Sequence, residues 1–222
     1  MASNNSGEVG SRAPREPRWP ASLATLAALF FYMTLPETLT IRPGWVIPVL
    51  EGALLIPLTV TAPYRHREEV RLIRIASLLL IALVNLAILV SLASLVHVVL
   101  SGRPVTGRTL IFSGVQIWLT LILVFSLWYW ELDRGGPAVR GHADERTPDF
   151  LFPQMATHEL GQADWMPGFV DYLYLSFTNT TAFSPTDTMP LTPRAKVLML
   201  VEALASITTV VMVAGRAVNI LT

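Results

Sequence analysis

The chain has 222 residues, of which 52% are hydrophobic and 14% charged, with a mean hydropathy of +0.51 and a formal net charge of zero. This composition is too apolar and too poor in charge for an ordinary soluble domain, and it predicts an integral membrane protein. The balanced charge gives no sign of nucleic-acid binding, and the lack of cysteine excludes disulfides, thiol chemistry and cysteine metal sites.

Residues 1–18 are polar and contain three arginines, which predicts a disordered tail. Residues 19–108 contain three long apolar runs and are expected to form three transmembrane helices, over Trp19 to Leu39, Trp45 to Thr61 and Leu72 to Leu100. Two polar residues, Glu51 and Asn85, interrupt these runs. A carboxylate within a span costs about 2.5–3.5 kcal/mol, so Glu51 should face protein or water, either as an interhelical hydrogen-bond partner or as a proton or ion site.

Arginines concentrate on one side of the predicted spans. The tail and the segment from Tyr64 to Arg74 together hold seven, whereas the opposite loops hold Arg42, Arg103 and Arg108. The positive-inside rule therefore predicts a cytoplasmic N-terminus. The same basic segment could instead bind anionic lipid.

The next apolar run, residues 109–132, predicts a fourth transmembrane helix. It ends in Trp128, Tyr129 and Trp130, which are expected to form an aromatic belt at the bilayer edge. Residues 133–164 have mixed charge and a Gly-Gly-Pro sequence, so they predict a solvated linker, with an acidic vestibule at a pore mouth as the alternative.

We expect neither catalysis nor a cofactor. The sequence contains no nucleophile–base–orienter set, no HExxH motif and no phosphate-binding glycine loop. The four histidines lack the spacing of metal ligands, so no metal site is expected.

Residues 165–181 are expected to form the re-entrant segment, with a short helix from Gly168 to Thr181, where Phe169, Tyr172 and Leu173 begin a helically spaced apolar face. A helix of this length is only about 20 Å long, whereas crossing a bilayer takes about 30 Å. A polar loop at 182–189 and a long apolar helix at 193–221 follow. The predicted fold is therefore an all-α polytopic membrane protein, with five transmembrane helices and one re-entrant pore-type helix.

This last part of the chain resembles the pore helix, selectivity filter and inner helix of two-transmembrane potassium channels. The resemblance rests on Tyr174-Leu-Ser-Phe177, the pair Thr180-Thr181, Asp187, Met189-Pro-Leu-Thr-Pro193, Lys196 and Glu202-Ala-Leu204. It implies a channel-like module over 109–222, in which 109–132 is the outer helix. The whole layout also resembles an uncharacterised bacterial multi-pass membrane family with a degenerate channel-like loop.

The filter-like loop departs from the Thr-Val-Gly-Tyr-Gly pattern of those channels. Between Thr181 and Asp187 it has five residues and no glycine, so no residue is suited to the positive φ that turns successive carbonyls inward. A weakly selective cation path is expected instead. Its candidate residues are Thr180, Thr181, Ala182, Phe183, Ser184, Pro185, Thr186 and Asp187.

The inner helix contributes four further candidates, Glu202, Ser206, Thr208 and Thr209. Ser206 stands where the channel family often has a hinge glycine, and Glu202 is expected to contact the back of the re-entrant helix. The resemblance implies a homo-oligomer, a tetramer if the protein is a channel for monovalent cations, in the plasma or inner membrane. A non-conducting scaffold or accessory subunit and a small transporter are the alternatives.

The two predictions on orientation conflict. Five spans with a cytoplasmic N-terminus place the re-entrant loop on the cytoplasmic side, whereas potassium channels carry theirs outside. Either a proline-rich segment such as Trp45 to Thr61 does not cross, or the loop is inverted, or the charge rule does not hold here.

Overall fold

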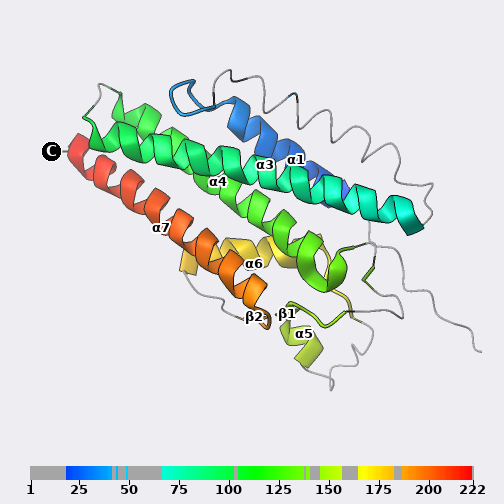
Figure 1. The fold of residues 1–222 in the computed structure, drawn as a ribbon. Coiled ribbons are helices and arrows are strands. Elements are labelled where there is room, and N and C mark those ends of the chain that lie inside the picture. Colours follow the sequence, from blue (N-terminus) through cyan, green and yellow to red (C-terminus); the bar gives the residue numbers. More distant parts are fainter. Residues whose placement is uncertain are drawn as a thin grey trace, which may run out of the picture.

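Figure 1 shows the computed structural model of the chain. The structure describes residues 19–41, 44, 49, 67–102, 105–137, 139–140, 146–156, 165–182 and 187–221. Of residues 67–73 and 217–221, only the backbone is described.

The described elements are almost all helical, which confirms the all-α prediction. They are α1 (Trp19–Met33), α3 (Arg67–Leu100), α4 (Gly107–Leu132), the 3₁₀ turn η1 (Asp133–Gly135), β1 (Phe150–Leu151), α5 (Pro153–Ala156), α6 (Phe169–Ala182), β2 (Met189–Pro190) and α7 (Pro193–Leu221). Three described segments are long and apolar enough to cross a membrane: Arg74–Leu100, Gly107–Gly135 and Pro193–Arg216.

The first predicted span is shorter than expected. Helix α1 has 15 residues and ends at Met33, whereas the sequence predicts a helix to Leu39. Pro36 explains the early end, because its ring has no N–H and would collide with the Tyr32 carbonyl if the helix continued. Of the predicted span at 45–61, the structure describes residue 49 alone, so Glu51 lies outside the described residues.

Helix α4 is the centre of the bundle, and α1, α3 and α7 all run antiparallel to it. The C-terminal parts of these three helices meet the start of α4: Gln116 donates a 2.8 Å hydrogen bond to Thr34 Oγ1, and Leu95 and Val213 both lie against Gly114. Figure 1 shows the same arrangement, with α1, α3 and α7 crossing α4 in the opposite direction. The other end of the bundle therefore gathers the starts of α1, α3 and α7 with the end of α4.

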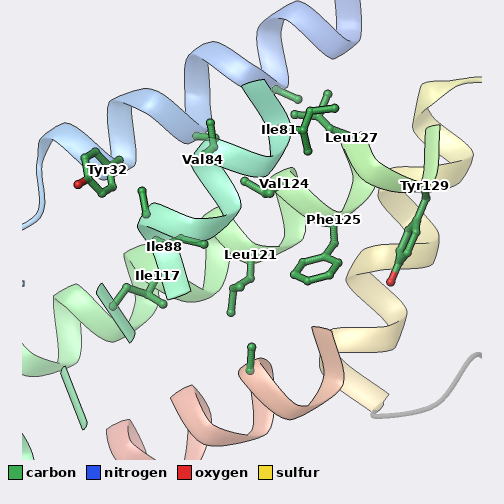
Figure 2. Packing of buried hydrophobic residues seen from close by; sticks show 14 of the residues in the cluster. Tyr32, Ile81, Val84, Ile88, Ile117, Leu121, Val124, Phe125, Leu127 and Tyr129 are labelled. Carbon is green, nitrogen blue, oxygen red and sulfur yellow. The ribbon is translucent and has the colours of Figure 1, made fainter. Parts of the chain in front are cut away.

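The core forms around α4 because apolar residues occupy most of its circumference. Ile117, Leu121, Val124 and Phe125 are fully buried. Figure 2 shows Ile88 of α3 packed among these α4 side chains. Gly114 lets α7 approach closely, since a Cβ built on it would lie 2.1 Å from Val213 Cγ2.

The predicted aromatic belt is wrong for two of its three members. Tyr129 is fully buried, and Trp130 is 6% exposed. Tyr129 packs on Phe150 with ring centroids 5.1 Å apart, and Trp130 packs on Phe169 at 6.0 Å. Both residues hold the linker and α6 against α4 instead of facing the bilayer edge.

Candidate functional site

Helix α6 lies between the C-terminal half of α4 and the N-terminal half of α7 (Figure 1). Its start is stabilised by Asp171, whose Oδ2 accepts a 2.8 Å hydrogen bond from the Gly168 N–H. The prediction starts the helix at Gly168, one residue before the observed start at Phe169.

Burial raises the pKa of Asp171, and the hydrogen bond from Gly168 acts in the opposite direction. The carboxyl group is half-buried where α6 begins. Desolvation has the larger effect because one N–H replaces only part of the lost hydration.

Arg140 joins the start of α6 to the end of α4. Its guanidinium donates to the Pro167 carbonyl at 3.0 Å and to the Trp130 carbonyl at 2.5 Å, and it stacks 4.9 Å from the centre of the Tyr172 ring. The Tyr172 hydroxyl in turn donates to Asp133 Oδ2 at 2.6 Å. These contacts place the beginning of α6 beside the end of α4.

The middle of α6 is held by Glu202 of α7, whose side chain is fully buried. Ser176 donates to Glu202 Oε1, while Asn179 Nδ2 and the Tyr129 hydroxyl each donate to Oε2 at 2.5 Å. The carboxyl group thus joins α4, α6 and α7. The expected contact between Glu202 and the back of this helix is present.

Ser176 has one hydroxyl proton but faces two acceptors. Its Oγ lies 2.9 Å from the Ile122 carbonyl oxygen and within hydrogen-bond distance of Glu202 Oε1. A neutral Glu202 would supply the missing proton by donating to Ser176, which would then donate to Ile122. Gln at position 202 could reproduce this pattern, because its amide offers one donor and one acceptor side.

The C-terminal end of α6 is held by Ser206 of α7. The Ser206 hydroxyl donates to the Thr180 carbonyl at 2.8 Å and accepts a 3.1 Å hydrogen bond from Trp118 Nε1 of α4. Trp118 also packs edge-on against Phe177 of α6, with centroids 6.3 Å apart. Ser206 therefore satisfies one of the four carbonyls that a helix end leaves free.

The chain after the loop returns to the end of the bundle from which α6 starts. Strand β2 pairs antiparallel with β1, and the Leu191 N–H donates to the Asp149 carbonyl at 2.8 Å. The Asp149 carboxylate accepts two 2.6 Å hydrogen bonds from Arg194, and the Asp149 N–H donates to Asp133 Oδ1 at 2.7 Å. The segments before and after α6 are thus fastened to each other and to η1.

The described part of the linker is largely buried, which corrects the predicted solvated loop. Asp133, Asp149 and Phe150 are each at most 1% exposed. The linker buries these residues because the Phe150 ring packs against Tyr129 of α4 and Tyr172 of α6. The Asp133 carboxylate binds Tyr172, and the Asp149 carboxylate binds Arg194 of α7.

The predicted path-lining residues fall into three groups. Thr181, Ala182 and Asp187 are exposed, whereas Thr180 is fully buried within its own chain. This corrects the expectation that both threonines of the pair face a path, because Thr180 lies against α7 and its hydroxyl donates to the Ser176 and Phe177 carbonyls. The remaining four, 183–186, lie outside the described residues.

Three further predicted residues, Thr208, Thr209 and Asn85, lie on the long helices α7 and α3. The Thr208 and Thr209 hydroxyls donate to the Leu204 and Ala205 carbonyls of their own helix. Asn85 is half-buried on α3, and its Oδ1 has no hydrogen-bond partner. Within the described ranges, no group of three or more potential metal ligands is found.

Sequence reasoning missed Tyr129, Trp118, Asp133, Arg140 and Asp149 as parts of this site. The available signal was the position of Asp133 directly after an apolar helix, where an acid is unfavourable beside the helix dipole unless it has a partner. Comparisons with protein-family models, with curated proteins and with solved structures find no match for this chain.

Proposed function

We propose that this protein is a channel-like integral membrane protein in which α4, α6 and α7 act as outer, pore-type and inner helices. One observation carries the proposal: α6 begins at one end of the α4–α7 pair, and the segment that follows it, from β2 to the start of α7, lies at that same end. Between these points α6 reaches Ile122 and Ser206, about 15 Å and 20 Å along α4 and α7 from that end. A re-entrant helix has this geometry.

Several copies of the chain would be needed to enclose a path, since each carries one such helix. By the resemblance to potassium channels, we propose four copies around the C-terminal ends of α6, in the plasma or inner membrane. That end directs partial negative charge toward a cation. Thr181 and Asp187 are exposed on either side of the loop. The Thr181 hydroxyl donates to the Phe177 carbonyl at 2.8 Å, so it offers its oxygen as an acceptor, and Asp187 offers a carboxylate. Such groups favour partly hydrated monovalent cations with little discrimination by size.

The same geometry supports an inverted loop. The end at which α6 starts holds Arg74, Arg134, Arg140, Arg146 and Arg194 among the described residues, so the positive-inside rule favours the cytoplasmic face. Because α1, α3 and α7 all begin there, this placement does not depend on whether 45–61 crosses. A crossing at 45–61 would complete the proposed five spans.

Planar-bilayer recording under bi-ionic potassium and sodium tests conduction. We expect a small cation current with a reversal potential near zero, and its loss in Asp187→Asn. Lys196→Gln is the matched control, because it removes an exposed charge close to the start of α7 but outside the loop. Strong potassium selectivity would overturn the proposed path, as would a current that Asp187→Asn leaves unchanged.

A non-conducting scaffold is the second candidate, and Thr180 favours it. Both its carbonyl and its hydroxyl are bound within the chain. The threonine pair therefore offers one exposed hydroxyl where the resemblance implies two. An intact oligomer that passes no current would support the scaffold.

A further inference from the structure

Two arginines, Arg74 and Arg146, lie at the end of the bundle where α6 and α7 begin. Arg74 lies in the first third of α3, and Arg146 lies in the linker. Within the part of the chain that the structure describes, neither donates a hydrogen bond, and Arg74 Nε is buried without an acceptor. A buried donor without a partner is costly, so a missing acceptor is indicated.

Both side chains lie against the turn that ends α4. A Cβ built on Gly135 would lie 3.6 Å from Arg146 Nε, and one built on Gly136 would lie 3.7 Å from Arg74 Nε. The two glycines have φ of +91° and +92°, and a Cβ on Gly136 would also lie 2.9 Å from the Glu131 carbonyl oxygen. Glycine is therefore required here, and it lets both arginines approach the same stretch of backbone.

The buried acids that the structure describes at this end already interact with other groups. Asp149 binds Arg194, and Asp133 lies 3.8 Å from Arg134 Nε. Glu131 is the remaining buried acid, and its Oε2 lies 3.6 Å from the built Cβ of Gly136. Arg74 interacts electrostatically with Arg146 and Arg194 as well as with Glu131 and Asp149. None of the acids that the structure describes at this end accepts a hydrogen bond from Arg74 or Arg146.

The depth of these residues matches a lipid headgroup. Gly135 and Pro193 are the terminal residues of two candidate spans at this end, and Arg74 lies beside Gly136. All three therefore lie near the level at which hydrocarbon gives way to headgroups. On α3, Ile75, Leu79 and Leu86 are 45%, 61% and 59% exposed. This apolar surface begins next to Arg74 and extends into the proposed bilayer, where an acyl chain can lie.

We propose that Arg74 and Arg146, above the Gly135–Gly136 turn, bind the phosphate of an anionic phospholipid headgroup. Guanidinium groups match phosphate oxygens in charge and in forked geometry. Free phosphate shares this chemistry, but the adjoining apolar surface of α3 favours a lipid. The site is independent of whether α6 conducts.

Native mass spectrometry of the full chain in neutral detergent tests the site. The probes are phosphatidylglycerol, phosphatidylcholine and inorganic phosphate. We expect phosphatidylglycerol to bind more tightly than the other two, and Arg74→Gln/Arg146→Gln to weaken it about 30-fold. Arg108→Gln, at the opposite end of α4, is the matched control and should change nothing.

The conservative variant Arg74→Lys/Arg146→Lys guards against a folding defect. It keeps both charges but loses the forked geometry, so its affinity for phosphatidylglycerol should fall between those of the wild type and the glutamine variant. Equal affinity in wild type and the glutamine variant would overturn the proposal. Equal binding of the two phospholipids, or inorganic phosphate binding as tightly as phosphatidylglycerol, would overturn the assignment to an anionic lipid.

Discussion

Replacing Glu202 tests how α6 is held. Glu202→Ala removes the acceptor for three donors, but Ser176 keeps the Ile122 carbonyl and Asn179 keeps the Met199 carbonyl at 3.1 Å. Among the described residues, only the buried Tyr129 hydroxyl loses its one acceptor. An unsatisfied buried hydroxyl costs about 1–3 kcal/mol, and each lost interhelical bond in a membrane protein costs about 0.6 kcal/mol. We therefore expect Glu202→Ala to lower the free energy of unfolding by about 2–4 kcal/mol.

Glu202→Gln is the matched control. Its amide oxygen can accept from Tyr129 and Asn179, while its amide nitrogen donates to Ser176 Oγ. We expect a loss below about 1 kcal/mol, because each donor keeps an acceptor. Equilibrium unfolding in mixed micelles, followed by circular dichroism, measures both variants. The reasoning fails if Glu202→Ala is as stable as the wild type, or if Glu202→Gln lowers the free energy of unfolding as much as Glu202→Ala does.

Two further substitutions test the packing of α4 and the start of α6. Gly114→Leu should lower the free energy of unfolding by about 1–3 kcal/mol, because even its Cβ would overlap Val213, and adding Val213→Ala should recover part of the loss in the same assay. The raised pKa of Asp171 means that the folded chain holds this proton more tightly than the unfolded chain does. This group's contribution should therefore make stability highest below its ordinary pKa of 3.8 and lower it as the pH rises through the raised pKa. Asp171→Asn should remove this dependence of the free energy of unfolding on pH. An unchanged pH dependence in the variant would contradict its assignment to Asp171.

The sequence predicts the helices at the end of the chain well because their signals are local. Helix α7 spans Pro193–Leu221, as expected from a proline at the first helical position and a long apolar run. The contact of Glu202 with α6 is also predictable, since a carboxylate within a span needs a partner on a neighbouring helix.

The rest of the site depends on tertiary partners that no local pattern reveals. Asp149 and Arg194 are 45 positions apart, and nothing near either one predicts their pairing. Tyr129 and Trp130 match the composition of an aromatic belt, but the linker and α6 cover them. The end of α1 is misplaced because its apolar run continues past Pro36, where the helical backbone cannot.

Cysteine labelling from the two sides of a membrane tests most directly whether α6 is re-entrant. The chain has no cysteine, so single substitutions report without background. Thr147→Cys and Met189→Cys are exposed sites before and after α6, and Ser101→Cys is an exposed site at the other end of the bundle. We predict that a membrane-impermeant maleimide labels the first two from one side and Ser101→Cys from the other. Labelling of Thr147→Cys and Met189→Cys from opposite sides would contradict the account.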